Sequence, residues 1–215
     1  MKEPFRIIFE DEYIVVLEKQ AKILTLPSPK KEKYTLTSLL EEKLKKPVYP
    51  CHRLDRETTG LIIYAKSRNI QERIMNEFRQ GIVKKKYIAF VRGRLKQRRG
   101  MLSGYVIDKE GKRFGEKPKK AKSGFYVLSE RNNYSVVELE PLTGRTNQLR
   151  IQLADAGCPI LGERKYAFGR DFRVNFRRLA LHACFISFIH PTTGKKLNFR
   201  LDLPSDMKTF LSEKA

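Results

Sequence analysis

The stretch that decides the fold runs from His52 to Ser67 and reads HRLDRETTGLIIYAKS. Its second half, Leu61 to Ala65, is a compact apolar run of the length and composition of a buried strand. Its first half is polar and ends in Thr59-Gly60, where the glycine lets the backbone turn tightly into the strand. The stretch therefore predicts a charged loop that leads directly into a buried strand.

A helix and a further strand are predicted directly after this stretch. Ile70, Ile74 and Phe78 recur at helical spacing, with Ser67 as a candidate N-cap and Gly81 as a candidate C-cap. We therefore expect an amphipathic helix over residues 68–80, followed by a strand from Lys85 to Arg92.

Before the stretch, Phe5 to Lys19 contains two apolar runs broken by Glu10-Asp11-Glu12, which predicts two strands joined by a tight turn. Ser38-x-x-Glu41 resembles a capping box, so we expect it to open a short helix that ends before Pro47.

The second half of the chain is strand-rich. Residues 122–129 and 134–140 predict a hairpin around Asn132-Asn133, and residues 147–156 predict a helix closed by Gly157-Cys158-Pro159. Two more strands are expected at 180–188 and 195–201, separated by a turn over 190–194. Meandering strands with a few helices predict an α+β fold with a mixed, mainly antiparallel central sheet and flanking helices and loops.

The composition restricts the class of protein. With 215 residues and 40% hydrophobic residues, the chain can bury a sizeable core as one domain. Forty-five Lys and Arg stand against 24 Asp and Glu, which gives a formal net charge of +21 and favours polyanionic partners, nucleic acid first.

Targeting and redox signals are not evident. No apolar run approaches the ~18 residues of a membrane span, and the N-terminus does not read as a signal peptide. Cys51, Cys158 and Cys184 form no disulfide framework and no four-cysteine zinc motif. We therefore expect a cytoplasmic protein without membrane attachment.

Positive charge is concentrated between Lys84 and Lys122. This segment holds fifteen lysines and arginines and three acids, so it carries twelve of the twenty-one net charges. A solvated loop face is the simpler explanation, but blocks of like charge repel one another unless an anion neutralises them. We interpret residues 84–122 as a basic RNA-binding segment.

The loop at the start of the deciding stretch is a candidate site. Arg53 and Arg56 flank Asp55, and nearby positive charge favours the ionised carboxylate. Taken alone, this pattern is more typical of a structural salt bridge. Tyr87, taken alone, is more typical of a half-buried strand tyrosine.

Four blocks, taken together, are more specific. They are HRLDRETTGLIIYAKS at 52–67, KKYIAFVRG at 85–93, PLTGRTNQLRIQL at 141–153 with GCPILGERKY at 157–166, and LALHACFISFIHPTTG at 179–194. In this order the blocks resemble the RluA family of RNA pseudouridine synthases, and the resemblance spans almost the whole chain.

The resemblance implies a pseudouridine synthase fold over residues 1–215 as a single catalytic domain, with no separate N-terminal RNA-binding domain. It implies isomerisation of uridine to pseudouridine within structured RNA, an isomerase reaction. By resemblance, Asp55 is the catalytic aspartate and nucleophile, Tyr87 the active-site tyrosine, and Arg150 the ion-pair partner of Asp55. Whether Asp55 attacks C1′ or acts by another route stays open.

The enzyme must also extract its target base from the stack. We expect Arg53 to fill the gap that the flipped base leaves. The other residues for which we expect RNA contacts are His52, Arg56, Thr59, Lys85, Lys86, Arg145, Asn147 and Gln148.

Two departures from the family pattern affect positions near the site. Asn147 stands where the family usually has His in T-G-R-x-H-Q, so it keeps a hydrogen-bonding side chain but loses the imidazole. The usual Lys-Pro-x-Gly after the second strand is here Lys19-Gln20-Ala21-Lys22. Neither departure touches the aspartate, the tyrosine or the arginine.

The expected partner is RNA, with ribosomal RNA favoured and transfer RNA possible, and we expect a monomer. We expect no cofactor, no nucleotide cofactor and no metal: no Gly-rich phosphate loop is present, and His182 and Cys184 lack further ligands at a recognisable spacing. Glu57 as the second carboxylate of a glycoside hydrolase is a weak alternative. The serious alternative is a basic RNA-binding or ribosome-associated protein without catalysis.

Overall fold

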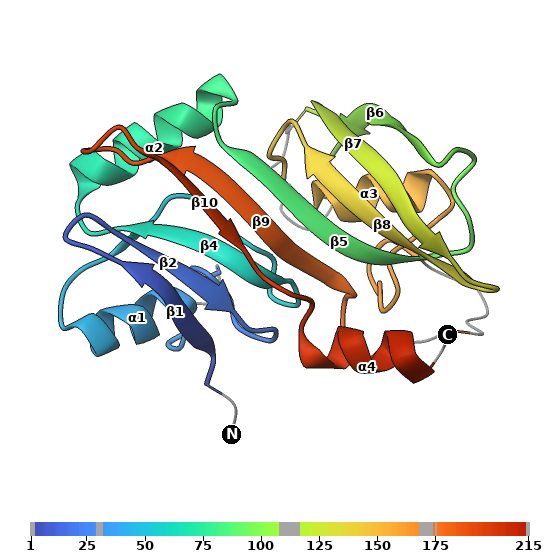
Figure 1. Cartoon of the computed structure of the whole chain (residues 1–215), viewed down its shortest axis with the longest axis horizontal. Coiled ribbons are helices and arrows are strands. Elements are labelled where there is room, and N and C mark those ends of the chain that lie inside the picture. Colours follow the sequence, from blue (N-terminus) through green and yellow to red (C-terminus); the bar gives the residue numbers. More distant parts are fainter. Residues whose placement is uncertain (1–2, 29–31, 108–116, 168–173, 175, 214–215) are drawn as a thin grey trace. The chain divides into compact units, whose positions relative to one another are not determined.

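The computed structural model describes residues 3–28, 32–107, 117–167, 174 and 176–213 (Figure 1). The chain forms two compact units. Unit 1 comprises Met1–Lys85 and His182–Pro204, and unit 2 comprises Lys86–Leu181 and Ser205–Ala215. Nine residues of the basic stretch, 108–116, lie outside the described part of the chain.

Unit 1 is built on a mixed sheet. Its strands are β1 (Phe5–Glu10), β2 (Ile14–Lys19), β3 (Tyr49–Pro50), β4 (Thr59–Ala65), β9 (Leu181–Ile189) and β10 (Lys196–Arg200). The strand order is β1-β2-β4-β9, with β3 paired to β4 and β10 paired to β9. β4 and β9 run parallel, and the other pairs in this unit are antiparallel. The strand pair predicted for Phe5 to Lys19 is confirmed.

Two helices of unit 1 pack on opposite faces of this sheet. α2 (Arg68–Gln80) buries Ile70 and Ile74 in a cluster with alternate residues of β2 and β4. α1 (Leu36–Leu44) lies on the other face, where the Thr37 hydroxyl is 3.1 Å from the hydroxyl of Tyr64. Because both faces are covered, every residue of β4 is buried, which explains its continuous apolar run.

Gly60 makes the parallel pairing of β4 and β9 possible. Its φ is +117°, a conformation that favours glycine, and a Cβ atom at this position would lie 2.2 Å from the carbonyl oxygen of Ala183. The predicted role of Gly60 in a tight turn is therefore supplemented by a close approach between two strands.

Unit 2 contains an antiparallel sheet. Its strands follow the order β5-β8-β7-β6, where β5 is Lys84–Arg92, β6 Arg99–Val106, β7 Lys119–Glu130 and β8 Tyr134–Pro141. The predicted hairpin around Asn132-Asn133 is formed by β7 and β8. Unit 1 therefore supplies the mixed part of the fold and unit 2 the antiparallel part, as the predicted α+β class requires.

Two helices belong to unit 2. α3 (Gln148–Asp155) packs behind β7 and β8 in the view of Figure 1, and its Gln152 bonds to Ser123 of β7 and Leu102 of β6. α4 (Ser205–Glu213) places Phe210 against Phe90 of β5, with ring centroids 5.7 Å apart. These contacts hold one helix on each side of the sheet.

Some element predictions were wrong in detail. The N-cap of α1 is Thr35, and Ser38 occupies the third helical position of that capping box, so the helix begins before the predicted Ser38. β6 and α4 were not predicted at all. β6 has a weak sequence signal because it is largely exposed and its glycines and serine interrupt the apolar residues. No helix in the described ranges is long and apolar enough to span a membrane.

Candidate active site

Asp55 lies in unit 1, on the loop between β3 and β4. A buried lysine anchors this loop. The Lys19 ammonium donates to the carbonyl oxygens of Arg56 at 3.1 Å and Thr58 at 2.8 Å in the loop, and to that of Gln20 at 2.9 Å beside it in the chain. Lys19 is fully buried, so these bonds lie away from water and hold the backbone after Asp55 firmly. The Thr58 amide closes a turn on the Asp55 carbonyl at 3.1 Å.

The backbone before Asp55 is fixed by a threonine. The buried Thr25 hydroxyl donates to the Leu54 carbonyl at 3.1 Å and accepts from the Leu54 amide at 3.3 Å. The Lys22 amide donates to the Arg56 carbonyl at 2.8 Å, which ties the same segment to the far side of Asp55. The loop that carries Asp55 is therefore anchored on both sides of this residue through its main chain.

The altered turn at 20–22 keeps this anchoring. Lys22 occupies the position where the family pattern has glycine, and its φ is +71°, in the left-handed region that glycine adopts without strain. The Lys22 carbonyl also accepts a bond from the Arg56 guanidinium at 3.4 Å. The departure predicted to alter a loop near the substrate thus leaves the loop bonded to the Asp55 segment.

His52 and Thr59 are both tied to other protein groups. Nε2 of His52 accepts the Ile63 amide at 3.1 Å, and burial, with the nearby positive charge of Lys85, lowers the pKa of His52 to about 3. His52 is therefore neutral at physiological pH. The buried Thr59 hydroxyl lies 2.9 Å from Nδ1 of His182. Their predicted contacts with RNA stay predictions.

Lys85 lies close to the ring that packs on His52. Its ammonium is 5.3 Å from the centroid of Phe78, whose ring is in turn 5.1 Å from the His52 ring. Burial lowers the pKa of Lys85 to about 8, so in mildly alkaline solution the amine is neutral in a substantial fraction of the molecules. Arg53 and Arg56, by contrast, are exposed, as residues expected to contact RNA must be.

Tyr87 lies in unit 2 on β5, where it faces Leu139 of β8. It is 8% exposed, so its side chain is buried for most of its length. The neighbouring Lys86 points to the opposite side of the strand, where its ammonium lies 2.7 Å from the Glu138 carboxylate. The strand thus separates the tyrosine from this ion pair.

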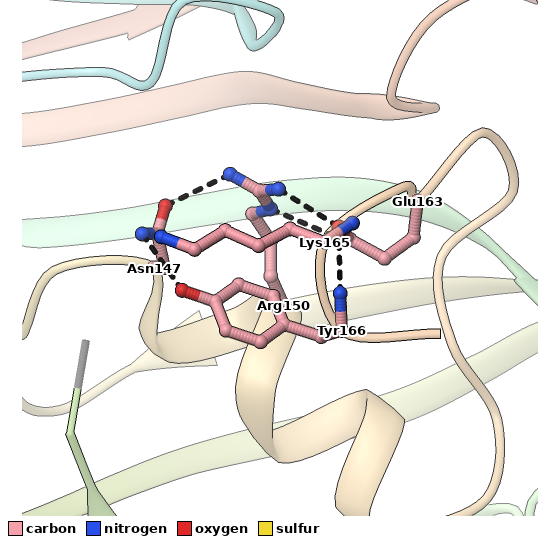
Figure 2. A network of polar contacts seen from close by, with 5 residues as sticks. All are labelled: Asn147, Arg150, Glu163, Lys165 and Tyr166. Atoms are coloured by element: carbon pink, nitrogen blue, oxygen red, sulfur yellow. Dashed lines mark hydrogen bonds and ion pairs between the residues drawn. The ribbon is translucent and has the colours of Figure 1, made fainter. Parts of the chain in front are cut away.

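Arg150 lies on α3 in a dense polar network (Figure 2). Its guanidinium binds Glu163 with two bonds, Nε to Oε2 at 2.7 Å and Nη2 to Oε1 at 2.8 Å. Its plane also lies over the Tyr166 ring, 5.2 Å from the centroid. Two parallel bonds and a ring contact fix the orientation of the guanidinium more strictly than one ion pair could.

Glu163 is the anchor of this network. Its side chain has no exposed surface, and its Oε1 also accepts the amides of Lys165 at 2.8 Å and Tyr166 at 3.3 Å. Burial alone would raise the pKa of Glu163, but the bonds and charge of Arg150, with the two amides, outweigh burial and lower the pKa. Glu163 therefore remains ionised and holds the Arg150 guanidinium.

Asn147 joins the two sides of the network. Its Oδ1 accepts from Nη1 of Arg150 at 2.9 Å, and its Nδ2 donates to the Tyr166 hydroxyl at 3.0 Å. Asn147 is the N-cap of α3 with φ of +53°, and its side chain does not cap the helix. Asn147 therefore positions Arg150 with its side-chain amide, where the family pattern has an imidazole.

Gln148 and Arg145 differ in their exposure. The Gln148 amide is 4% exposed and bonds to the Thr143 hydroxyl at 2.7 Å, the Ser123 hydroxyl at 2.8 Å and two main-chain groups. Arg145 is exposed and donates to the Lys120 carbonyl at 3.3 Å. Gln148 therefore supports the loop before α3, and contacts of both residues with RNA stay predictions.

Among the described residues, no group of three or more His, Cys, Asp or Glu side chains is placed to hold a metal ion. His182 and Cys184 are both buried. Cys51, Cys158 and Cys184 are free thiols. What the two units offer for chemistry is therefore a fixed aspartate in one and an oriented guanidinium with a buried tyrosine in the other.

The model of the RNA pseudouridylate synthase family matches residues 13–155 of this chain. The chain belongs to this family of RluA-type RNA pseudouridine synthases. The match includes the loop of Asp55, the strand of Tyr87 and the helix residue Arg150. The resemblance identified from the four sequence blocks is confirmed.

Individual relatives agree with this assignment. The tRNA pseudouridine synthase C of Vibrio cholerae is 32% identical over 232 residues, covering 96% of this chain and 94% of that protein. The RNA pseudouridine synthase YjbO of Bacillus subtilis is 30% identical over 220 residues, covering 97% and 76%. The structure of human RNA pseudouridylate synthase domain containing 4 superposes with a TM-score of 0.76 at 25% identity, covering 96% and 91%. The predicted fold class and the activity of an RNA pseudouridine synthase, an isomerase, are confirmed.

Sequence reasoning missed the residues that hold the site in place. Lys19 and Thr25 had no role assigned, although Lys19 stands at the lysine of the family's turn pattern. Glu163 and Tyr166 belong to the block GCPILGERKY, which was recognised without a function for either residue. A glutamate and a tyrosine three residues apart, downstream of a predicted helix with an arginine, is the signal that could have found them.

Proposed function

We propose that this RNA pseudouridine synthase uses Asp55 as its catalytic carboxylate and Tyr87 and Arg150 as its partners, without a cofactor. What supports the role of Asp55 most is the anchoring of its loop: buried Lys19 and Thr25 fix the main chain on both sides. A residue whose main chain is held in this way needs little backbone reorganisation to meet a substrate atom.

The reaction rearranges bonds within one nucleotide. The N1–C1′ glycosidic bond breaks, the uracil rotates, C5 bonds to C1′, C5 loses its proton and N1 gains one, so the product is an isomer of uridine. Asp55 acts on the sugar or base as an ionised carboxylate, either by covalent attack at C1′ or by another route. Tyr87 packs against the target base and helps to move the C5 proton.

Arg150 acts through its charge. In the proposed complex it forms an ion pair with Asp55, and its bonds to Glu163 and Asn147 preset the direction of the guanidinium. Exposed Arg53 fills the position that the flipped uracil vacates, which recovers part of the few kcal/mol that unstacking costs. Exposed Arg56 and Arg145 bind backbone phosphates. The protein acts as a monomer in the cytoplasm.

Two RNA classes are candidates for the substrate. The sequence analysis favours ribosomal RNA, while the name of the Vibrio cholerae relative, matched over 94% of its length, favours transfer RNA. We propose transfer RNA as the first substrate to test because that match covers nearly both whole chains.

The test is tritium release from unmodified RNA labelled at C5 of uridine, with ribosomal and transfer RNA supplied separately. C5 loses its hydrogen only when it bonds to the sugar, so release measures the reaction itself. Release from transfer RNA alone supports the proposal. Release from ribosomal RNA alone contradicts the choice of substrate, and release from neither, despite salt-dependent binding of both, favours an RNA-binding protein without catalysis.

A further inference from the structure

One face of the β6–β7 hairpin in unit 2 carries exposed side chains from both strands. Residues directly opposite each other in this pair share a face: Arg99 faces Tyr126, Met101 faces Gly124, and Tyr105 faces Lys120. In the view of Figure 1, α3 lies behind the strands, and no described helix covers β6 and β7 from the front. We call this surface the hairpin face, and its members are Arg99, Met101, Ser103, Tyr105, Lys120, Lys122, Gly124, Tyr126 and Leu128.

The hairpin face exposes large apolar side chains. Tyr105 is 63% exposed, Met101 50%, Tyr126 49% and Leu128 44%. On the other face of β7, Ala121, Ser123 and Val127 are buried, so the strand register places Met101, Tyr105 and Tyr126 outside, and Leu128 follows at a β-bulge. Apolar side chains gathered on one face of a folded sheet indicate an interaction surface.

Basic side chains lie between the aromatic rings. Arg99, Lys120 and Lys122 are all exposed on the same face. Among the described residues of β7 and β8, the acids near it are Glu130, Glu138 and Glu140; Glu138 is paired with Lys86 and Glu130 with Arg94. The charge on β6 and β7 is therefore positive, and it selects a partner that carries negative charge and flat apolar groups.

Unpaired RNA combines these two properties. Its bases stack on exposed aromatic side chains of a sheet, and its phosphates bind interleaved lysines and arginines. Tyr105 and Tyr126 lie six strand positions apart, about 20 Å, which leaves room for about six nucleotides at a stacked spacing of ~3.4 Å. Duplex RNA has its bases paired and offers no free ring faces, and a lipid surface offers no rings at all.

We propose that the hairpin face binds an unpaired segment of the RNA substrate, away from the nucleotide that reacts. Bases stack on Tyr105 and Tyr126, and phosphates bind the lysines between them. This inference rests on the proposed function for the identity of the RNA. The face lies on the side of the sheet opposite α3 and Arg150, so it adds affinity and leaves the chemical step to other residues.

Binding of a fluorescein-labelled oligouridylate of about 12 nucleotides, followed by anisotropy, tests the role of the rings. We expect Tyr105→Ala/Tyr126→Ala to weaken binding by about tenfold or more for each tyrosine. The matched variant Tyr105→Phe/Tyr126→Phe keeps both ring faces and should bind within about twofold of the wild type. The affinity for a labelled hairpin duplex should differ little between the alanine variant and the wild type.

The salt dependence of the same binding tests the role of the charges. Lys120→Gln/Lys122→Gln should lower the slope of log affinity against log salt by about 1.4, because each phosphate contact on a single strand contributes ~0.7. An unchanged slope, or equal loss of affinity in the phenylalanine and alanine variants, overturns the proposal. Loss of a dimer in the alanine variant, with RNA binding unchanged, would overturn it in favour of a protein partner.

Activity separates this inference from the proposed function. At saturating full-length RNA, the alanine variant should release tritium at the wild-type rate with a raised KM. If the wild type binds oligouridylate through both tyrosines and releases no tritium from any RNA, the proposed function fails and the binding surface stands. If the wild type releases tritium and KM is the same in the wild type and the alanine variant, the proposed function stands and the proposed binding surface fails.

Discussion

The loop of Asp55 and the network of Arg150 are held in different ways. In unit 1, Lys19 and Thr25 bind main-chain groups on both sides of Asp55. In unit 2, Arg150 itself is bound, through its guanidinium, by Glu163 and Asn147. One region therefore fixes the path of the backbone and the other fixes the direction of a side chain.

This difference explains which departures from the family pattern the chain tolerates. Replacing Pro and Gly in the turn at 20–22 leaves both bonds to the loop, because the Lys22 bond comes from the main chain and Lys19 itself is unchanged. Replacing His by Asn147 changes a side chain that touches Arg150 directly, so the new residue has to supply its own bonds.

The largest expected effect comes from removing the lysine beneath the loop. Lys19→Met keeps the length and apolar stem of the side chain but removes the ammonium that donates to three carbonyl oxygens. The Arg56 carbonyl keeps the Lys22 amide as a donor, and the buried Thr58 carbonyl loses its bond to Lys19. We expect a loss of about 3 kcal/mol in the free energy of unfolding and a sharp fall in tritium release. Urea unfolding measures the first quantity. Lys196→Met, at an exposed lysine of β10, is the control and should change stability little.

A smaller effect is expected in the other region. Glu163→Gln removes the charge that binds Arg150, and because the carboxylate is buried we expect a loss of about 2 kcal/mol at pH 7. Glu138→Gln breaks the half-exposed pair with Lys86 in the same unit and should cost under about 1 kcal/mol. Equal losses in the two variants would contradict the special role of the Glu163 network.

The pH dependence of stability in wild type and Glu163→Gln tests the same network. The pKa of Glu163 is lower in the folded protein than in the unfolded chain, where it is about 4.3. Its stabilisation is therefore fully present above the unfolded value and is lost as the pH falls through the lower folded value. The stability difference between wild type and Glu163→Gln should be constant from pH 7 to about 5 and then shrink. A difference that grows on acidification contradicts the assignment.

The smallest expected effect comes from Asn147. Asn147→Ala removes two side-chain hydrogen bonds. It also places alanine, whose side chain forms no local hydrogen bonds, at φ of +53°, so we expect a loss of about 1 kcal/mol in the free energy of unfolding. Asn147→Gly relieves the backbone but also lacks the bonds. If tritium release falls in both variants while stability falls mainly in the alanine variant, the side chain positions Arg150. Wild-type release in both would show that Glu163 alone is sufficient.

Elements with local sequence signals were predicted correctly, and those that depend on the tertiary fold were not. The helix over 68–80 was predicted with both caps, because Ser67, Gly81 and the apolar spacing are local signals. β6 was missed because its two glycines and a serine interrupt the apolar residues, which leaves no regular apolar alternation in this exposed edge strand. The N-cap of α1 was misplaced because Thr35 and Ser38 both fit the capping pattern, and the tertiary fold chooses between them.

For the site, the sequence named the residues expected to react but not those that hold them. Asp55, Tyr87 and Arg150 were found through blocks that resemble a family. Lys19 and Glu163 act over 39 and 13 residues of chain, to Thr58 and Arg150, and nothing local in the sequence links these partners. Contacts of this kind are set by the fold, so they could be read only from the structure.

The most direct measurement compares wild type with Asp55→Asn in two assays on one preparation each: tritium release from RNA labelled at C5 of uridine, and binding of the same RNA. The substitution keeps the size of the side chain and removes its charge, while the main-chain anchoring of the loop is untouched. We predict that Asp55→Asn binds RNA within about threefold of the wild type and releases no tritium. Release at the wild-type rate would contradict the role of Asp55 as the catalytic carboxylate.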